Sequence, residues 1–464
     1  MLYQSTRGAA TPLDFRAVTL AGLAPDGGLY LPQHWPQFTA DEIAALAGCD
    51  YAETAARVLA PFVGECIGAD DLRTLTRTAY GRFSHDAVTP LVQLDSRNWL
   101  LELFHGPTLA FKDVALQMLG LLFEKFLTGT NKQLTIVGAT SGDTGSAAID
   151  AVAGRAQISI VMLHPAGRVS DVQRRQMTTV IADNVHNVAI DGSFDDAQAM
   201  VKRMFADVEV TSNVTLSAVN SINWARLAAQ VVYYFYSAVR LGAPHRSVAY
   251  SVPTGNFGDV FAGYVAAKMG LPIARLVVAT NVNDILHRAL SAGDYSAGTV
   301  TPTATPSMDI QVSSNFERLL FDLGGRDGAA MAEQMRGFES SKAMQLTNSQ
   351  REGAAALFTS ASIDGDGMAG ALRWAWDHAG QVIDPHTAIG LAAARADLSD
   401  PSIPMVTLAT AHPAKFQDAV ERATGRRPAL PTRIGSLFDR EERYTSLPGD
   451  YGAVRDFVLA HAAG

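Results

Sequence analysis

The chain has 464 residues, of which 48% are hydrophobic and 18% are charged, and its formal net charge is −9. This composition argues against extended disorder, and the length predicts two or three domains with ample apolar content for a core. The acidic balance, with no block of lysine and arginine to offset it, argues against a nucleic-acid partner.

Neither the cysteines nor the apolar runs point to a secreted, metal-binding or membrane protein. Cys49 and Cys66 have neither metal-ligand spacing nor the pattern of a disulfide framework. The first residues carry no apolar signal region, and no stretch reaches the roughly 18 apolar residues of a membrane span. We therefore expect a cytoplasmic protein with two reduced thiols, no bound metal and no membrane contact.

The N-terminal part of the chain, residues 1–95, is predicted to form a separate and mainly helical domain. Helical patterns cover 40–47, 51–60 and 69–79, and strand patterns are few.

From about Trp99 onward, short β-rich runs alternate with helical patterns. Strands are expected at 99–103, 133–137, 158–163, 187–190, 248–252, 276–279 and 405–409. Helices are expected at 110–127, 146–153, 194–206, 224–241, 259–269 and 387–394. Strands separated by helices of this length predict right-handed βαβ units and parallel sheets, so the fold class is α/β. The stretches 291–307 and 424–432 are expected to be loops.

Lys112 occupies an unusual place for a lysine. It follows His105-Gly106-Pro107-Thr108-Leu109-Ala110-Phe111 and precedes an apolar run that reaches Leu127. The Gly-Pro-Thr entry predicts a helix start, which puts Lys112 in the first turn, where the helix dipole disfavours a cation. Apolar neighbours also favour the neutral amine, which is a nucleophile for carbonyl groups. The alternative is a solvated lysine paired with Asp113.

Two loops of small residues each follow a predicted strand and precede a predicted helix. The loop Pro253–Asp259 can point backbone N–H groups at one anion, although it lacks the glycine spacing of a dinucleotide site. The loop Gly138–Ser146 is equally rich in glycines and hydroxyls. The alternatives are a tight turn without a ligand for the first loop, and helix capping by Asp143 or Thr144 for the second. A nucleophilic lysine and an anion loop together suit a cofactor with an aldehyde and a phosphate, such as pyridoxal 5′-phosphate.

Short motifs along the chain resemble those of the threonine synthases, in their long bacterial and fungal form. They occur in the same order from about Tyr3 to Phe416. The motifs are STRG at 5–8, GLAPDGGLYLP at 22–32, HGPTLAFKD at 105–113, ATSGDTGSA at 139–147, NSINWAR at 220–226, SVPTGNFGD at 251–259, SMDIQVSSNFER at 307–318, DPHTAIG at 384–390 and TAHPAKF at 410–416.

The resemblance implies a fold like that of the tryptophan synthase β chain, with two open, mostly parallel sheets and flanking helices beside the N-terminal domain. Residues 96–130 and 226–464 would form a large domain that binds the cofactor phosphate, and residues 131–225 a small substrate domain. The implied reaction converts O-phospho-L-homoserine and water to L-threonine and phosphate with pyridoxal 5′-phosphate. A monomer or a homodimer is expected.

The resemblance also implies cofactor-binding residues. Lys112 would form the Schiff base with the cofactor, and the loop residues Thr254, Gly255, Asn256, Phe257 and Gly258 would hold its phosphate. Thr410, at a strand end, would lie beside the pyridine nitrogen; the alternative is a hydroxyl that bonds the backbone. Asp143 stands where the wider fold family commonly carries an asparagine that faces the ring oxygen. A carboxylate there needs a proton or a nearby cation.

For the substrate, Thr140, Ser141 and Thr144 are the candidates that would bind the carboxylate. The candidates for the substrate phosphate are Ser313, Ser314, Asn315, Arg318 and Lys415, because an arginine fork matches phosphate geometry. The alternative for Arg318 is a surface helix residue paired with Glu317 or Asp322. Once displaced by the substrate amine, Lys112 would act as base and acid, first at Cα and then at Cβ.

Two rival functions remain open at this point. One is a phospholyase on the same fold that releases a keto acid instead of threonine. The other is a metabolite-binding protein that keeps the scaffold without catalysis, against which the intact Lys112 motif speaks.

Overall fold

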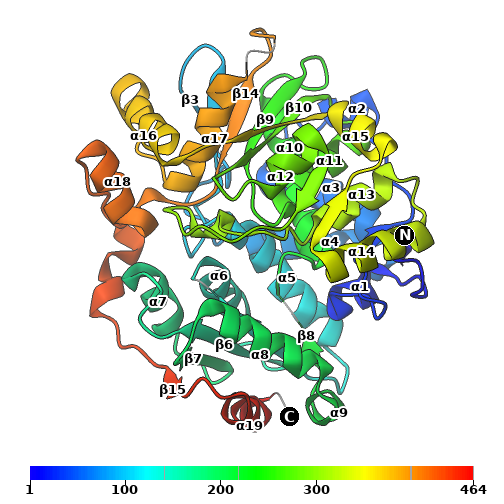
Figure 1. Ribbon diagram of the computed structural model, residues 1–464, viewed down its shortest axis with the longest axis vertical. Helices are drawn as coiled ribbons and strands as arrows, with labels where there is room; N and C mark the ends of the chain where they lie inside the picture. The colour runs from blue at the N-terminus through cyan, green and yellow to red at the C-terminus, as the bar shows by residue number, and fades with distance from the viewer. Residues whose placement is uncertain (141, 218, 398–399, 463–464) are drawn as a thin grey trace.

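The computed structural model describes residues 1–140, 142–217, 219–397 and 400–462. Two α/β layers lie one above the other, and the long helix α5 (Lys112–Leu127) lies between them (Figure 1). Among the described residues, no helix is both long enough and apolar enough to cross a membrane. The predicted fold class, with two mostly parallel sheets, is confirmed.

The larger sheet has six strands in the order β13-β10-β9-β14-β4-β3. Neighbouring strands are parallel except for β3, which runs antiparallel to β4. The strands are β3 (Leu91–Gln93), β4 (Asn98–Glu102), β9 (Val248–Pro253), β10 (Ile273–Thr280), β13 (Phe358–Ser362) and β14 (Met405–Ala409).

Helices cover both faces of this sheet, which explains why its strands are apolar on both sides. Along β10, Leu276 and Val278 pack into the core that includes α10 (Trp224–Arg240) and α11 (Gly258–Lys268). Val277 and Ala279 point the other way, into the core that includes α17 (Pro385–Ala396). The helix α16 (Gly365–Ala379) packs against α17.

The smaller sheet has five strands in the order β15-β7-β6-β5-β8, and all of its pairs are parallel. They are β5 (Leu134–Ala139), β6 (Ile158–Pro165), β7 (Val185–Ile190), β8 (Leu216–Ser217) and β15 (Thr445–Leu447). The helices on this sheet are α6 (Asp143–Val152), α7 (Asp171–Thr178), α8 (Phe194–Ala206), α9 (Val208–Asn213) and α19 (Tyr451–His461).

The last strand and helix of the chain belong to the smaller sheet. β15 pairs with β7, and Val454 and Val458 of α19 pack in the core beneath that sheet. We therefore propose the predicted division into domains with one change. Residues 445–461 are counted with the small domain rather than with the large one, because their backbone pairing and burial lie there.

The N-terminal region contains the three helices predicted from the sequence, which correspond to α2, α3 and α4, and also α1 and η1, which the sequence analysis does not predict. These helices are α1 (Phe15–Ala21), α2 (Ala40–Ala44), α3 (Tyr51–Val63), the short 3-10 helix η1 (Gly64–Cys66) and α4 (Ala69–Tyr80), beside the two-stranded sheet β1 (Tyr3–Ser5) and β2 (Tyr30–Pro32). α3 packs against α10, and α4 packs against α5.

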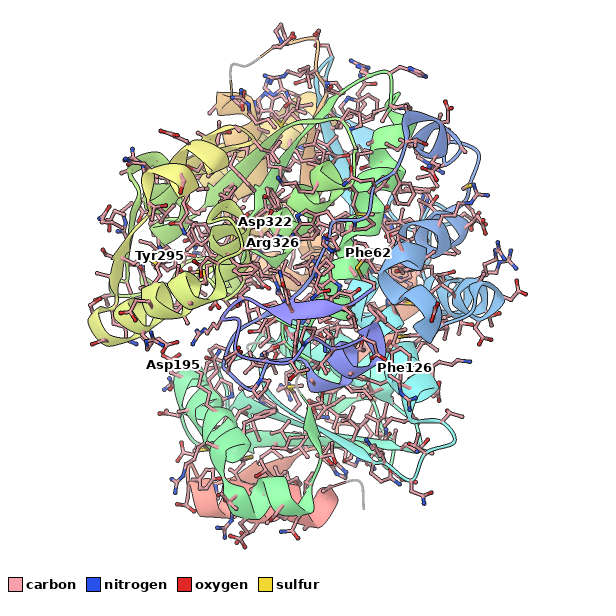
Figure 2. All side chains as sticks on the ribbon, turned by 90° about the vertical axis from the view of Figure 1, so that its right-hand side faces the viewer. Phe62, Phe126, Asp195, Tyr295, Asp322 and Arg326 are labelled. Atoms are coloured by element: carbon pink, nitrogen blue, oxygen red, sulfur yellow. The ribbon has the colours of Figure 1, made fainter. Side chains whose placement is uncertain are left out.

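The predicted loop 291–307 is partly wrong. It contains β11 (Asp294–Ser296), which pairs antiparallel with β12 (Ala343–Gln345), a partner too far along the chain to be seen in the local composition. The same part of the molecule holds α12 (Ile285–Ala292), η2 (Pro306–Met308), α13 (Phe316–Leu323), α14 (Gly328–Ser341) and α15 (Asn348–Ala355). Asp322 and Arg326, which form an ion pair of 2.6 Å, lie side by side at the end of α13 (Figure 2).

The predicted loop 424–432 does separate α18 (Gln417–Thr424) from η4 (Thr432–Asp439), and η3 (Pro413–Phe416) precedes α18.

Candidate active site

Three chain segments converge at the carboxyl edge of the six-stranded sheet, because β9, β14 and β4 are parallel neighbours. Loop 254–258 follows β9, and Thr410 follows β14. The segment after β4 leads to Lys112. The Phe111 N–H donates to the Thr410 carbonyl at 2.8 Å, and the His412 N–H donates to the Leu109 carbonyl at 3.0 Å. These bonds bring Lys112 beside Thr410.

Lys112 lies in the first turn of α5, as predicted, although the helix begins at Lys112 and not at Ala110, and its side chain is only 11% exposed. Its Nζ lies 3.3 Å from Asp143 Oδ2. Asp113 is not its partner, since that carboxyl accepts the Thr108 N–H at 2.8 Å and the Thr108 hydroxyl at 2.7 Å. The alternative of a solvated lysine paired with Asp113 is therefore wrong. Burial lowers the pKa of the Lys112 amine, and the charge of Asp143 offsets part of that effect.

Asp143 supplies the acidic centre of this cluster. Its Oδ1 lies 2.8 Å from Lys415 Nζ and accepts a hydrogen bond from Gln173 Nε2 at 2.8 Å. Burial by itself would raise the pKa of Asp143, but the ammonium groups of Lys415 and Lys112 hold it below its ordinary value. The cation that a carboxylate at this position needs is thus Lys415. Gln173 lies on α7, a helix that the local sequence pattern does not predict.

Lys415 does not stand free to meet a substrate phosphate. Its side chain is fully buried, and Nζ also donates to the Thr108 carbonyl at 2.8 Å. The predicted phosphate contact of Lys415 is therefore not supported, because both of its described partners are protein oxygens.

The loop 254–258 connects β9 to α11 through an unusual backbone. Phe257 has φ of 63°, in the left-handed region, and Gly258 then begins the helix. A Cβ on Gly255 would lie 2.4 Å from the Ser307 carbonyl oxygen, so only glycine fits there. The Thr254 hydroxyl donates to the Val252 carbonyl at 2.6 Å. The loop is held in one shape at a helix start, as an anion site requires.

The predicted residues 313–315 lie against this loop. The Ser313 hydroxyl donates to the Gly255 carbonyl at 2.7 Å, and the Asn315 side-chain amide donates to the Asn256 carbonyl at 2.9 Å. The Ser314 hydroxyl donates to Asn256 Oδ1 at 3.3 Å. The structure thus joins the two predicted phosphate-binding segments into one cluster.

Arg318 is neither a surface residue nor an exposed phosphate ligand. Its side chain is completely buried. Nε donates to the Tyr30 carbonyl at 3.0 Å, Nη2 donates to the Ile222 carbonyl at 2.6 Å, and Nη1 bonds Asn315 Oδ1. Burial lowers the pKa of the guanidinium to about 9. Both sequence interpretations of Arg318 need correction, because α13 turns this side chain inward toward backbone carbonyls.

The hydroxyl-rich loop after β5 is shaped by Thr140. Its Oγ1 accepts the N–H groups of Gly142 and Gly145, each at 2.9 Å. The N-cap residue of α6 is Gly142, and the first-turn N–H of Gly145 is satisfied by Thr140, so the predicted alternative of capping by Asp143 or Thr144 is wrong. Thr144 is half-buried. Ser141 lies outside the residues that the structure describes.

Thr410 is buried, with 6% of its surface exposed. Its carbonyl accepts the bond from Phe111, but its hydroxyl makes no hydrogen bond to any residue that the structure describes. The alternative of a strand-end hydroxyl that bonds the backbone is not what is observed, and the hydroxyl is left for another partner.

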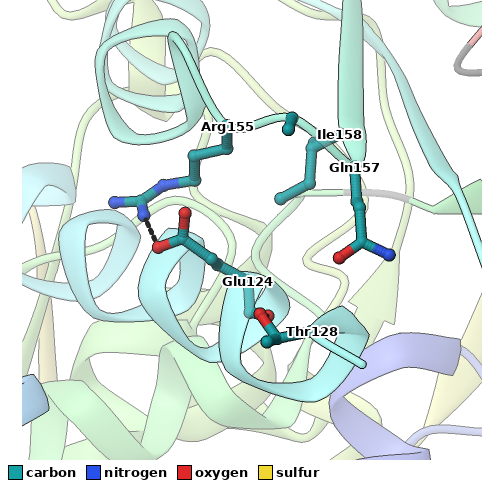
Figure 3. A pocket seen from close by; sticks show the side chains of 6 residues that line it. Glu124, Thr128, Arg155, Gln157 and Ile158 are labelled. Carbon is teal, nitrogen blue, oxygen red and sulfur yellow. Dashed lines mark hydrogen bonds and ion pairs between the residues drawn. The ribbon is translucent and has the colours of Figure 1, made fainter. Parts of the chain in front are cut away.

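A small pocket of about 130 Å³ lies elsewhere, at the opposite end of α5 from Lys112. An ion pair between Arg155 and Glu124 crosses it (Figure 3). Its lining contains none of the predicted site residues, so it is not part of the candidate site.

Comparison with known proteins covers nearly the whole chain. Residues 2–80 match the family described as "Threonine synthase N terminus", residues 83–410 match "Pyridoxal-phosphate dependent enzyme", and residues 387–458 match "Threonine synthase, C-terminal". A threonine synthase of Pseudomonas aeruginosa is 54% identical over 99% of this chain and 98% of its own length. That of Saccharomyces cerevisiae is 42% identical over 91% and 89%.

Solved structures agree with these matches. The crystal structure of pyridoxal-phosphate-bound threonine synthase from Brucella melitensis superimposes with a TM-score of 0.98 at 52% identity, covering all of both chains. The yeast threonine synthase superimposes with a TM-score of 0.94 at 39% identity, covering 99% of this chain and 98% of its own. Identity at this level over the full length, on the same fold, means that the chain belongs to the threonine synthase family.

Proposed function

We propose that this chain is a pyridoxal-phosphate-dependent enzyme that converts O-phospho-L-homoserine and water to L-threonine and phosphate, the last step of threonine biosynthesis. The observation that carries this proposal is a buried Lys112 amine at the same carboxyl edge of the six-stranded sheet as the Thr410 hydroxyl and the loop 254–258. The relatives named as threonine synthases, one of them with bound pyridoxal phosphate, support it.

The described residues fit the cofactor at each of its polar ends. Lys112 would bond its aldehyde carbon, the loop Thr254, Gly255, Asn256, Phe257 and Gly258 would receive its phosphate, and the Thr410 hydroxyl would meet its ring nitrogen. When bound, the cofactor supplies an electron sink for charge that develops on the substrate carbon. Lys112, once free, is the described amine placed to remove and return protons at Cα and Cβ.

The substrate contacts are proposed with the changes that the geometry suggests. Ser313, Ser314 and Asn315 remain the candidates for the substrate phosphate, and Arg318 becomes a positioning residue that holds Asn315. Ser141 and Thr144 remain the candidates for the substrate carboxylate. Thr140 holds the shape of their loop.

Three further properties complete the proposal. We propose a small-molecule substrate with no nucleic-acid partner, because the net charge is −9 without a basic block. A cytoplasmic location and a monomeric or homodimeric state follow from the sequence expectations and are proposed with them.

Two measurements on the purified protein with added pyridoxal 5′-phosphate test the function. Incubation with O-phospho-L-homoserine should yield threonine and phosphate, whereas 2-oxobutyrate with ammonia would instead support the phospholyase alternative. Borohydride reduction and peptide mapping should place the pyridoxyl group on Lys112. Lys112→Ala should abolish both results, and Lys125→Ala, an exposed lysine on the same helix, should change neither. A pyridoxyl group on another residue would contradict the assignment.

A further inference from the structure

The buried cluster around Asp143 holds one carboxylate between two lysines, whose contacts with protein oxygens differ in number and in length. Lys415 Nζ makes two contacts of 2.8 Å, with Asp143 Oδ1 and with the Thr108 carbonyl, and its side chain is fully buried. Lys112 Nζ has one described hydrogen-bond partner, Asp143 Oδ2 at 3.3 Å, and lies 5.1 Å from the centroid of the Phe111 ring; its side chain is 11% exposed. Short charge-assisted bonds are the stronger ones, so Lys415 is held more tightly than Lys112.

The charges of this cluster do not balance. One carboxylate compensates one ammonium, and each uncompensated charge in a buried site costs desolvation energy. The second ammonium is therefore in excess. Because Lys415 has two protein acceptors and Lys112 has one distant acceptor, Lys112 is the amine that gives up its proton most readily.

The other charged groups near Lys112 act in the same direction or are engaged elsewhere. Arg226 on α10 is buried, and its positive charge repels the Lys112 ammonium. Asp113 on α5 is tied to Thr108 by two hydrogen bonds and does not bond Lys112. Asp143 is therefore the described carboxylate that could hold a proton on Lys112, and Lys415 already compensates it.

We propose that Lys415 is a positioning residue that serves as the permanent counter-ion of Asp143 and so allows Lys112 to react as a neutral amine. The lone pair of that amine forms the C–N bond to the aldehyde carbon of the cofactor, and both amine protons leave with the carbonyl oxygen as water. The inference rests on the proposed function only in taking Lys112 as the lysine that bonds pyridoxal 5′-phosphate.

The test is the pH dependence of recombination between the cofactor-free protein and pyridoxal 5′-phosphate, followed by visible absorbance without substrate. In Lys415→Met, the Lys112 ammonium becomes the sole lysine partner of Asp143. The midpoint is the pH at which the second-order rate constant of recombination reaches half of its maximum. We expect this midpoint to move up by at least about one pH unit and the rate constant at pH 7 to fall about tenfold. Lys415→Arg keeps the charge and should restore a midpoint close to that of the parent protein.

Two further variants separate a charge effect from general damage. Asp143→Asn leaves both ammoniums without a carboxylate, so the midpoint should fall below that of the parent protein. The double variant Lys415→Met with Asp143→Asn should bring the midpoint back down from its Lys415→Met value. Lys125→Met, on the exposed side of α5, is the control and should leave the midpoint unchanged.

A Lys415→Met midpoint at or below that of the parent protein would overturn the proposal. So would a double variant whose midpoint stays as high as that of Lys415→Met. If Lys415→Met does not fold, Asp143→Asn decides: a lowered midpoint supports the proposal and an unchanged one overturns it. Since recombination needs no substrate, a failure here while threonine still forms from O-phospho-L-homoserine counts against the Lys415 role alone.

Discussion

Two buried carboxyl groups near the site are placed in opposite electrostatic surroundings. Asp143 lies between lysines, whereas Asp259 at the start of α11 lies against the hydroxyls of Tyr233 and Tyr234. Burial raises the pKa of Asp259 to about 7, and the tyrosine hydrogen bonds lower it only in part. Its Oδ2 is buried and has no partner among the described residues. The same side chain is thus an ion at position 143, whereas at position 259 it still holds its proton below a pH of about 7.

Asp259 should make the protein less stable as the pH rises. The folded state holds this proton more tightly than the unfolded chain, so the stabilisation is fully present below the ordinary pKa of 3.8 and is lost as the pH passes through about 7. In denaturant titrations of the cofactor-free protein, Asp259→Asn should lose less stability between pH 5 and pH 8 than the parent protein, by an amount on the order of a few kcal/mol. Asp71→Asn, an exposed carboxyl on α4, serves as control. Equal losses in Asp259→Asn and the parent protein would contradict the assignment.

At the scale of elements, the junction between β9 and α11 carries the most demanding local geometry. Phe257 takes a positive φ, and the centroid of its ring lies 5.1 Å from the ring centroid of Phe316 on α13. This packing holds a backbone conformation that phenylalanine rarely adopts. The loop is therefore fixed before any ligand arrives, which lowers the entropic cost of binding an anion.

Two glycines of this loop should respond differently to an added methyl group. In Gly255→Ala the new Cβ would lie 2.4 Å from a backbone carbonyl oxygen that cannot easily move, whereas in Gly258→Ala it would lie 3.3 Å from the Asn315 side chain. Overpacking of this kind costs about 1–3 kcal/mol, so Gly255→Ala should weaken pyridoxal 5′-phosphate binding at least about fivefold. Equilibrium titration of the cofactor measures this. A Gly258→Ala variant with the larger loss would reverse the expected order.

The strands and helices predicted from local pattern are of the right type, but the pattern leaves several elements unpredicted, the helices α13 to α16 among them. The strand predicted at 405–409 coincides with β14, and the helix predicted at 194–206 coincides with α8. β13, α7 and β15 were missed. Thr445–Leu447 becomes a strand because it pairs with the edge of β7. The residues of this segment do not by themselves predict that pairing.

At the scale of the whole molecule, the chain crosses between its two sheets and returns. After β14 and α18 in the upper layer, it descends to β15 and α19 at the foot of the molecule (Figure 1). Val454 and Val458 of α19 are completely buried against the five-stranded sheet. The C-terminal end is therefore part of the smaller core rather than an appendage.

Placing a charge in this core should loosen the smaller layer. Val458→Asp buries a carboxylate without a partner and should cost about 3–5 kcal/mol of unfolding free energy, as other buried unpaired charges do. Hydrogen exchange should show lost protection in β6 and β7 before β9 and β14. Ala460→Asp, at an exposed position of the same helix, should cost no more than about 0.5 kcal/mol. Equal effects of the two variants would contradict the docking of α19.

The sequence by itself determined the α/β class, the helix start at Lys112, the two small-residue loops and, through its motifs, the resemblance to the threonine synthases. These features are local: periodicity, capping residues and short ordered motifs are visible in neighbouring residues. Only the tertiary structure decided which side chains meet. In it, Arg318 points inward and donates to the Tyr30 carbonyl, and Asp143 pairs with Lys415 and accepts a hydrogen bond from Gln173. These partners lie far apart along the chain. Asp143 follows β5 of the five-stranded sheet and Lys415 follows β14 of the six-stranded sheet, so they meet only where the two layers pack together, which no local pattern records.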